Sequence, residues 1–258
     1  STFFKTGTLE KTSGMTNNRV MPEPYERLCR VYDAGWSEFT LQYVPFVEGF
    51  IRDHGLEQAR ILDLACGTGV LALELARLGH TVHGIDSSPG MIRIAREKTA
   101  GVPGVTFDIG DMREFRTAQR YDVVTCTYDA LNYIRRLPEV KRVIGNVAGA
   151  LEPGGLFIFD VNTKVLYRHH AGETERREHN GEVFLQESRY NGSYKLATTL
   201  FSFADGECEM HQQRPYSYDE LRPILERAGF SIVNVFSWFS GIPYSPQAPK
   251  VFYVAEKQ

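Results

Sequence analysis

Short apolar runs alternate with amphipathic segments along most of this chain. Five runs have the length and the branched side chains of buried strands, namely residues 61–64, 81–85, 105–109, 121–127 and 156–161. Segments with helical periodicity lie between them, at residues 70–78, 91–99 and 138–151. Strands that alternate with helices form a sheet with helices on both faces. The pattern therefore predicts an α/β fold with a doubly wound sheet.

The pattern changes after residue 161. Three strand-like segments follow, at residues 183–190, 195–203 and 207–214. Asn-Gly and Asp-Gly pairs separate them, and these pairs are strong hairpin signals. We expect a three-stranded antiparallel flap at about residues 163–215, inserted after the fifth strand. Its alternation places Glu209, His211 and Gln213 on one face.

A helix and two further strands are expected after the flap. Ser217 and Glu220 form a capping box that begins the helix, and Gly229 closes it. The sixth and seventh strands are predicted at residues 231–239 and 250–255.

The segment before the first strand is aromatic, and its pattern is helical. Residues 25–55 predict helical structure, with Pro45 at a kink or at a break between two helices. Residues 1–24 form an N-terminal arm, and residues 25–258 form one domain with the flap inserted. We expect the arm to fold over a cleft or against a second subunit, so a homo-oligomer is one expectation.

Composition narrows the classes of protein and partner. A chain of 258 residues suffices for one large domain with an insertion. Its net charge of -3 and scattered Lys and Arg argue against a nucleic-acid partner, and no apolar run approaches the ~20 residues of a membrane span. The four cysteines form no Cys-x-x-Cys pair and the N-terminal residues are polar, so we expect a cytoplasmic protein without a metal site. His169 and His170 are expected in a solvated loop.

Residues 60–69 are the first candidate for ligand binding. The predicted strand ends near Asp63, and Gly67 and Gly69 then allow a tight turn with a close approach of backbone to ligand. Gly67-x-Gly69-x-x-Ala72 satisfies a loose dinucleotide fingerprint, so an NAD-dependent dehydrogenase is one hypothesis. A carboxylate at the mouth of the turn would repel a pyrophosphate and suits a positively charged ligand instead.

Two further strand ends carry acidic residues. Asp86 follows the second strand, 17 residues after Gly69, where a carboxylate accepts hydrogen bonds from ribose hydroxyls. Met91 begins the next helix, where it can lie on an adenine ring. Asp111 follows the third strand and can accept a hydrogen bond from an adenine amino group, while the Met112 backbone N–H reaches a ring nitrogen. Taken in order, these residues favour a ligand that contains adenosine.

The order of residues 61–69, an apolar run with Asp-Leu-Ala-Cys-Gly-Thr-Gly, resembles motif I of the class I methyltransferases that depend on S-adenosylmethionine (SAM). The commonest form of that family has glycine where Ala65 stands. The Pro-Gly-Gly turn at residues 153–155 is also similar to the family. The resemblance covers residues 25–256 and implies a seven-stranded Rossmann-like sheet, with the last strand inserted antiparallel, and an N-terminal helical lid.

The resemblance implies SAM as the methyl donor and S-adenosylhomocysteine as the product. SAM carries an ammonium and a sulfonium, which matches the charge preference inferred for Asp63. The family pattern implies that the lid and the strand ends contact the cofactor. The matching residues are Tyr25, Tyr32, Trp36, Asp63, Ala65, Gly67, Gly69, Asp86, Ser87, Met91, Asp111, Met112 and Thr127.

Methyl transfer is an in-line displacement at carbon, so the enzyme chiefly has to align the reactants and exclude water. Tyr32, Tyr128 and Tyr133 are candidates for contact with the sulfonium, because aromatic rings and oxygens stabilise its charge. Many small-molecule methyltransferases with such a flap have a His and an Arg just before the last main helix. His211 and Arg214 fit that pattern. The resemblance implies a general base at His211, and at Arg214 either an ion-pair anchor or a ligand for a substrate carboxylate.

The acceptor is expected to be a small molecule. No Asp/Asn-Pro-Pro-Tyr/Phe run follows the fourth strand, where amino-methyltransferases of nucleic-acid bases often carry one. The organisation resembles the glycine and amino-sugar N-methyltransferases, which implies transfer to nitrogen or oxygen. Three alternatives stay open: an NAD-dependent dehydrogenase, a tRNA or protein methyltransferase, and a non-catalytic SAM-binding partner.

Overall fold

The structure is a computed structural model, and it describes residues 23–237 and 241–258. The predicted arm at residues 1–24 therefore lies outside the described residues, except for its last two positions. The end of the strand predicted at residues 231–239 also lies outside them. Within the described part of the chain, no helix combines the length and the apolar character that a membrane crossing requires.

The main sheet has seven strands in the order β10-β11-β5-β4-β1-β2-β3. Their bounds are β1 (Arg60–Leu64), β2 (Thr81–Asp86), β3 (Val105–Ile109), β4 (Tyr121–Cys126), β5 (Leu151–Asn162), β10 (Phe230–Phe236) and β11 (Lys250–Lys257). β11 pairs antiparallel with both neighbours, whereas the other pairs are parallel. The predicted doubly wound sheet with an inserted antiparallel last strand is confirmed.

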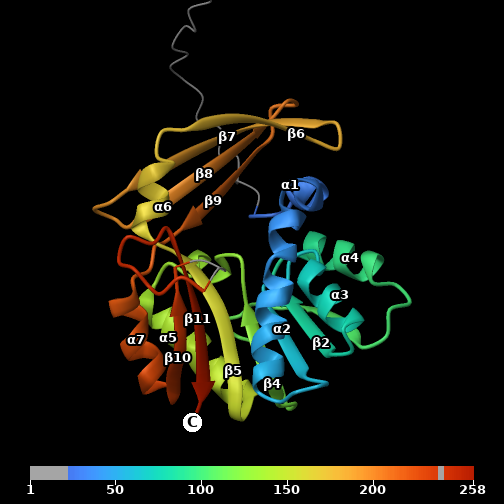
Figure 1. Ribbon diagram of the computed structural model, residues 1–258. Helices are drawn as coiled ribbons and strands as arrows, with labels where there is room; N and C mark the ends of the chain where they lie inside the picture. The colour runs from blue at the N-terminus through green and yellow to red at the C-terminus, as the bar shows by residue number, and fades with distance from the viewer. Residues whose placement is uncertain (1–22, 238–240) are drawn as a thin grey trace, which may run out of the picture.

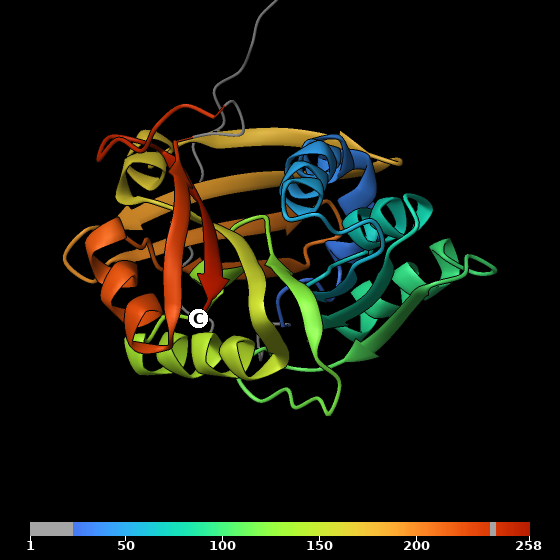
Figure 2. The ribbon, with the colours of Figure 1, turned by 60° about the horizontal axis from the view of Figure 1, so that its bottom comes forward.

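Apolar side chains cover both faces of this sheet. Leu62 and Leu64 of β1 pack in the cluster that contains α5 and α7, and Ile61 packs in the cluster with α2, α3 and α4. Figure 2 shows the two helical layers on either side of the sheet. The helices are α2 (Tyr43–Asp53), α3 (Val70–Arg77), α4 (Pro89–Lys98), α5 (Leu137–Ala150) and α7 (Tyr218–Arg227). A central parallel strand buried on both faces needs a continuous apolar run, which explains why these strands were predictable.

The helical segment before β1 breaks at Gln42, so the prediction of a break at Pro45 was wrong. α1 (Cys29–Leu41) ends just before Gln42, and α2 begins directly after it. Pro45 lies in the first turn of α2, where a missing N–H removes no intrahelical hydrogen bond. In Figure 1, α1 rises past the carboxyl ends of the strands toward the flap.

The flap is an antiparallel sheet of four strands, so the prediction of three was wrong. Its elements are α6 (Lys164–His169), β6 (Thr174–His179), β7 (Glu182–Asn191), β8 (Leu196–Phe203) and β9 (Cys208–Gln213). The sequence of β6, Thr-Glu-Arg-Arg-Glu-His, has no apolar alternation, so the pattern did not predict it. This edge strand forms through its pairing with β7. His169 and His170 end and cap α6 rather than lying in a loop. Figure 1 shows the flap across the carboxyl ends of the main sheet.

Gly67 and Gly69 share a left-handed backbone but have different surroundings. Their φ angles are +55° and +74°. A Cβ on Gly69 would lie 2.7 Å from Phe107 Cζ and 3.0 Å from Ala95 Cβ, whereas a Cβ on Gly67 would meet nothing within 4 Å. Gly69 therefore permits α3 to approach β3 and α4, and Gly67 borders open space.

We predict that Gly69→Ala lowers the free energy of unfolding by about 2–5 kcal/mol. A side chain on a residue with left-handed backbone costs ~1–2 kcal/mol, and overpacking adds ~1–3 kcal/mol. The matched control Gly67→Ala should carry only the backbone cost, about 1–2 kcal/mol. Urea unfolding of both variants measures the difference. Equal losses would contradict the packing role of Gly69.

Candidate functional site

Two neighbouring cavities open at the carboxyl ends of the sheet strands. The first, termed the sheet cavity, has a volume of about 900 Å³ and lies between the strand ends and residues 23–30. The second, termed the flap cavity, has a volume of about 300 Å³ and lies under the flap strands. Both are lined by the same four tyrosines, Tyr25, Tyr32, Tyr128 and Tyr133. These shared tyrosines mark the place where ligands in the two cavities would meet.

Most residues predicted to bind the cofactor line the sheet cavity. They are Tyr25, Tyr32, Ala65, Gly67, Asp86, Ser87, Met91, Asp111, Met112 and Thr127. Gly69, Trp36 and Asp63 lie outside this lining. Trp36 stacks on Tyr32, with 5.5 Å between ring centroids, and it lines the flap cavity instead. The structure thus brings ten of the predicted residues together around one cavity.

Four residues that border the cavities have a left-handed backbone although none is glycine. Their φ angles are +56° at Ala65, +68° at Tyr25, +61° at Tyr128 and +51° at Asp129. Side chains rarely adopt this conformation, and the strain persists only where surrounding contacts enforce it. Ala65 stands where glycine is most common in the family that the motif resembles, and its φ accounts for that preference.

Asp86 holds the glycine turn from the end of β2. Its carboxylate accepts hydrogen bonds from the N–H of Gly67 at 2.9 Å and of Ser88 at 2.8 Å. Burial raises the pKa of this carboxyl, and the two hydrogen bonds oppose the rise. Each carboxylate oxygen has a further lone pair, so Asp86 can also accept hydroxyl donors from the cavity.

Asp63 lies behind the glycine turn rather than at its mouth. The residue is 2 % exposed, and Oδ1 accepts a hydrogen bond from Thr125 Oγ1 at 2.6 Å. Burial raises the pKa of this carboxyl to about 7, and the nearby charge of Asp86 adds to the rise. Asp63 therefore lies outside the sheet-cavity lining, and its attraction to a positively charged ligand stays a prediction.

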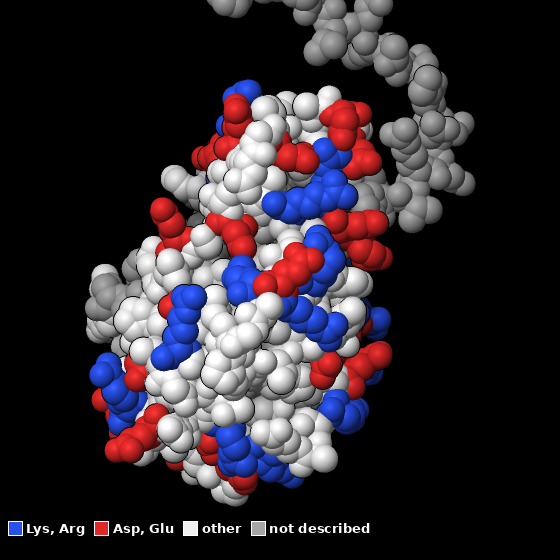
Figure 3. Space-filling view, turned by 90° about the vertical axis from the view of Figure 1, so that its right-hand side faces the viewer, with Lys and Arg blue, Asp and Glu red and all other residues white. Residues whose placement is uncertain are grey.

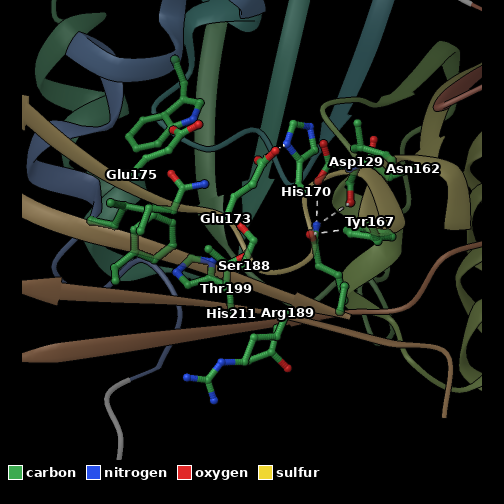
Figure 4. Close-up of a pocket in the computed structure, with 18 of the residues that line it drawn as sticks. Asp129, Asn162, Tyr167, His170, Glu173, Glu175, Ser188, Arg189, Thr199 and His211 are labelled. Carbon is green, nitrogen blue, oxygen red and sulfur yellow. Dashed lines mark hydrogen bonds and ion pairs between the residues drawn. The ribbon is translucent and has the colours of Figure 1, made fainter. Parts of the chain in front are cut away.

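The flap cavity has a mixed wall of aromatic and polar side chains, and Figure 4 shows its polar groups. Its wall carries hydroxyl, amide, imidazole and carboxylate groups, from residues that include Asn162, Tyr167, Glu173, Ser188, Thr199 and Gln213. Glu175 pairs with Arg177 at 2.6 Å, so part of the charge is balanced within the wall. Such a surface suits a small polar ligand, because a polar wall facing hydrocarbon would lose hydrogen bonds to water.

Comparisons with known proteins agree on one family. Residues 61–155 match the model of a methyltransferase domain. The chain is 30% identical over 245 residues to "Putative methyltransferase GWCH70_2453" of Geobacillus sp. (strain WCH70), covering 90% of this chain and 99% of the relative. It is 37% identical over 150 residues to a dTDP-4-amino-2,3,4,6-tetradeoxy-D-glucose N,N-dimethyltransferase of Saccharopolyspora spinosa, covering 58% of each chain. An S-adenosylmethionine-dependent methyltransferase from Clostridium acetobutylicum ATCC 824 superposes with a TM-score of 0.77 at 22% identity, covering 90% of this chain and 98% of that one.

The chain belongs to the SAM-dependent methyltransferase family. SAM is therefore its cofactor, and the prediction of methyltransferase activity is confirmed. The alternative of an NAD-dependent dehydrogenase rested on a loose glycine fingerprint, and these relatives do not support it.

In this methyltransferase, His211 lies beneath the shared tyrosines. Its Nδ1 is 2.7 Å from the Tyr133 hydroxyl, and its Nε2 is 2.6 Å from Glu209 Oε1. The Tyr133 hydroxyl is in turn 2.7 Å from the Tyr25 hydroxyl. Both ring nitrogens of His211 are thus engaged. The predicted base would meet an acceptor only through a tyrosine hydroxyl.

Arg214 lies outside the lining of both cavities. Its Nη2 pairs with Glu220 at 2.6 Å, and its guanidinium lies 4.6 Å from the centroid of the Tyr216 ring. Of the two roles expected for Arg214, the structure favours an ion-pair anchor at the start of α7. A ligand role toward a substrate carboxylate finds no support in this position.

Two residues that the sequence did not single out hold the turn after β4. Asp160 accepts hydrogen bonds from the N–H of Tyr128 at 2.6 Å and of Asp129 at 2.8 Å. Lys250 Nζ lies 2.7 Å from Asp160 Oδ2 and 2.9 Å from Asp129 Oδ1. Asp160 is 0 % exposed and Lys250 is 5 % exposed. The available signal was a charged residue next to the apolar run of each of two strands.

Asn132 ties the base of the flap to the main sheet. This fully buried residue belongs to the short helix η1 (Ala130–Tyr133) that follows β4. Its Nδ2 donates to the carbonyls of Asn162 at 2.9 Å and Arg214 at 2.7 Å, and its Oδ1 accepts from the N–H of Asn162 at 2.9 Å. It therefore forms hydrogen bonds with backbone groups at both ends of the flap. No local sequence motif predicts this role.

We predict that Lys250→Met lowers the free energy of unfolding by about 3–5 kcal/mol, because the buried Asp160 and the half-buried Asp129 lose their counter-charge. Lys195→Met is the matched control, since the side chain of Lys195 is 51% exposed in its pair with Glu220. The control should cost at most ~1 kcal/mol. Chemical denaturation at pH 7 measures both, and similar values would contradict the network.

The raised pKa of Asp63 makes stability depend on pH. The folded protein holds this proton up to a pKa of about 7, whereas the unfolded chain releases it near ~3.9, so stability falls as pH rises between these values. Asp63→Asn removes the effect. The stability advantage of the variant over wild type should grow by about 2–3 kcal/mol from pH 5 to pH 8. A constant difference in urea unfolding across this range would refute the assignment.

Proposed function

We propose that this enzyme transfers the methyl group of SAM to a nitrogen or oxygen of a small polar molecule bound in the flap cavity, and releases S-adenosylhomocysteine. One observation carries the proposal. Four tyrosines line both cavities, so a cofactor in the sheet cavity and an acceptor in the flap cavity would meet at those rings. We favour an amine as the acceptor.

The sheet cavity, with about 900 Å³, has room for the whole cofactor. In this proposal Asp86 accepts the ribose hydroxyls, and Asp111 accepts from the adenine amino group. Met112 supplies a backbone N–H to the adenine ring, and Met91 lies on its face. The sulfonium then reaches the shared tyrosines, whose rings and oxygens stabilise positive charge.

The flap cavity suits an acceptor that carries both hydroxyl and amine groups. Ser188, Thr199 and Gln213 offer uncharged donors and acceptors, and Glu173 offers negative charge that attracts an ammonium, whereas Glu175 is paired with Arg177. The relative from Saccharopolyspora spinosa is named for methylation of an amino sugar, which agrees with this chemistry. An aminated sugar or a molecule of similar polarity is therefore the acceptor class that we propose.

Methyl transfer itself requires little acid–base catalysis by the enzyme. The sulfonium is already a good leaving group, so the walls mainly align donor, methyl group and acceptor and keep out water. A neutral amine attacks directly. An ammonium must first lose a proton, and a hydroxyl also gains from a base.

A tRNA or protein acceptor is less consistent with the surface. Figure 3 shows Lys and Arg intermixed with Asp and Glu on the face that carries α3 and α4. Nucleic-acid sites need positive charge gathered on one surface. The intermixed charges on this face agree better with a small acceptor.

Thermal unfolding with S-adenosylhomocysteine and with NADH tests the cofactor site. At ~100 times its dissociation constant a ligand adds about 2.7 kcal/mol, which is a shift of roughly 5–11 °C for a domain of this size. We expect that shift with S-adenosylhomocysteine alone. Protection by NADH in its place would refute the proposed function.

Asp86→Asn should weaken S-adenosylhomocysteine binding by about 1–3 kcal/mol through lost charge-assisted hydrogen bonds. Asp108→Asn is the matched control, because the Asp108 side chain is 70% exposed at the end of β3 and lies outside the cavity lining. Calorimetry measures both affinities, and an unchanged affinity in Asp86→Asn would remove Asp86 from the ribose site. Product release with amino sugars and with matched sugars that carry hydroxyl in place of the amine then separates nitrogen from oxygen transfer.

A further inference from the structure

Glu209 of β9 is a fully buried carboxylate that receives four hydrogen bonds. The backbone N–H groups of Tyr25, Arg27 and Leu28 donate to it at 2.7, 2.8 and 3.1 Å. The fourth partner is His211 Nε2, at 2.6 Å. The side chain is 0 % exposed, so its charge is balanced entirely by these donors. One flap carboxylate thus binds both the start of the N-terminal segment and the ring of His211.

The N-terminal segment covers the sheet cavity, and the flap holds it there. Residues 23–30 contribute six positions to the lining of that cavity, namely Glu23, Pro24, Tyr25, Glu26, Cys29 and Arg30. Arg27 pairs with three flap carboxylates, those of Glu182, Asp205 and Glu207. Tyr25 has its strained φ of +68° where its N–H meets Glu209. The contact with Glu209 therefore holds a conformation that a free chain would leave.

A chain of hydrogen bonds runs from Glu209 through His211 to two of the shared tyrosines, Tyr133 and Tyr25. Burial favours a protonated Glu209, but the hydrogen bonds from His211 and the backbone prevail and hold its pKa below the usual value. The carboxylate then only accepts, so His211 Nε2 carries a proton, and Nδ1 is an acceptor in the neutral ring. With the ring neutral, Tyr133 donates to Nδ1 and Tyr25 donates to the Tyr133 oxygen, both over 2.7 Å. The Tyr25 oxygen keeps a free lone pair at the junction of the cavities.

We infer that Glu209 is a positioning residue that couples closure of the N-terminal segment over the cofactor to the assembly of a proton path from the acceptor to His211. The inference rests on the proposed function in that an ammonium acceptor supplies the proton. Closure over SAM and activation of the acceptor then depend on the same carboxylate.

The proton transfer balances without a further reactant. The acceptor ammonium gives a proton to the Tyr25 oxygen, Tyr25 gives its own to Tyr133, and Tyr133 gives its own to His211 Nδ1. The acceptor is left as a neutral amine, and His211 becomes an imidazolium beside the Glu209 carboxylate. The buried pair gains an attractive interaction at the moment that the amine becomes nucleophilic. His211 returns its proton to solvent when the segment opens.

The wild-type protein provides the first test. Nitrogen NMR on isotope-labelled histidine, with the His211 signal assigned by its loss in His211→Gln, reports which ring nitrogen carries the proton. The expected form has the proton on Nε2. A proton on Nδ1, alone or together with one on Nε2, would leave His211 unable to accept a proton and would overturn the inference. This result needs no variant of Glu209.

Glu209→Gln provides the second test, with Glu178→Gln as the matched control. Glutamine has one acceptor oxygen and must turn its N–H groups toward donors, whereas the side chain of Glu178 is 56% exposed on β6 and pairs with Arg176, away from both cavities. Calorimetry should find S-adenosylhomocysteine bound about 10–100-fold more weakly by Glu209→Gln and within about threefold of wild type by the control. The Nε2–H form of His211 should be lost only in Glu209→Gln. Wild-type affinity or an unchanged tautomer in that variant would overturn the coupling.

Tyr133→Phe separates the path from the closure, because it removes the middle hydroxyl and leaves the bonds of Glu209 in place. Turnover of an amine acceptor should fall about 10²-fold at a pH where the amine is charged. The loss should shrink as pH rises toward the pKa of that amine, since a neutral amine needs no path. A loss independent of pH would refute the path. Absence of S-adenosylhomocysteine binding by the wild type would instead refute the proposed function.

Discussion

The wall between the two cavities depends on the buried carboxylate of Asp160. It accepts the N–H groups of Tyr128 and Asp129, two successive residues with left-handed backbone. Within the described residues, neither N–H donates to a backbone carbonyl, so side-chain acceptors supply the hydrogen bonds. Lys250 balances the charge from the neighbouring strand β11. A buried ion pair of this kind contributes more to a defined geometry than to net stability, and that geometry sets where a methyl donor and an acceptor meet.

The flap is joined to the cofactor side of the molecule by polar contacts that span the whole chain. Asn132 satisfies the backbone at both ends of the flap, and Glu209 binds the segment around Tyr25, 184 residues away in sequence. These hydrogen bonds connect the N-terminal segment, the flap and the turn after β4 to one another. Methyl transfer needs alignment and exclusion of water more than it needs reactive side chains. A fold that closes around both substrates meets that need.

The sequence predicted the features that local patterns encode. Strands buried on both faces are apolar runs, and Asp86 follows such a run at a fixed distance from the glycine turn, so both were predictable. The charged edge strand β6 was missed because pairing with β7 specifies it. Asp160, Lys250, Asn132 and Glu209 were missed as site residues because most of their partners lie 30 to 184 residues away, although His211 is only two residues from Glu209. Gly69 and Trp36 were assigned to the cofactor and lie outside the sheet-cavity lining, where Gly69 is close to Phe107 and Trp36 stacks on Tyr32, so their cofactor contact stays a prediction.

A crystal structure of the full chain with S-adenosylhomocysteine and an amino-sugar acceptor tests the central claim most directly, which is that the two substrates meet at the shared tyrosines. The account predicts the ribose hydroxyls on Asp86, the sulfur facing Tyr32 and Tyr128, and the acceptor amine in line with it from the flap cavity. Cofactor density in the flap cavity, or an acceptor bound away from the tyrosines, would contradict it.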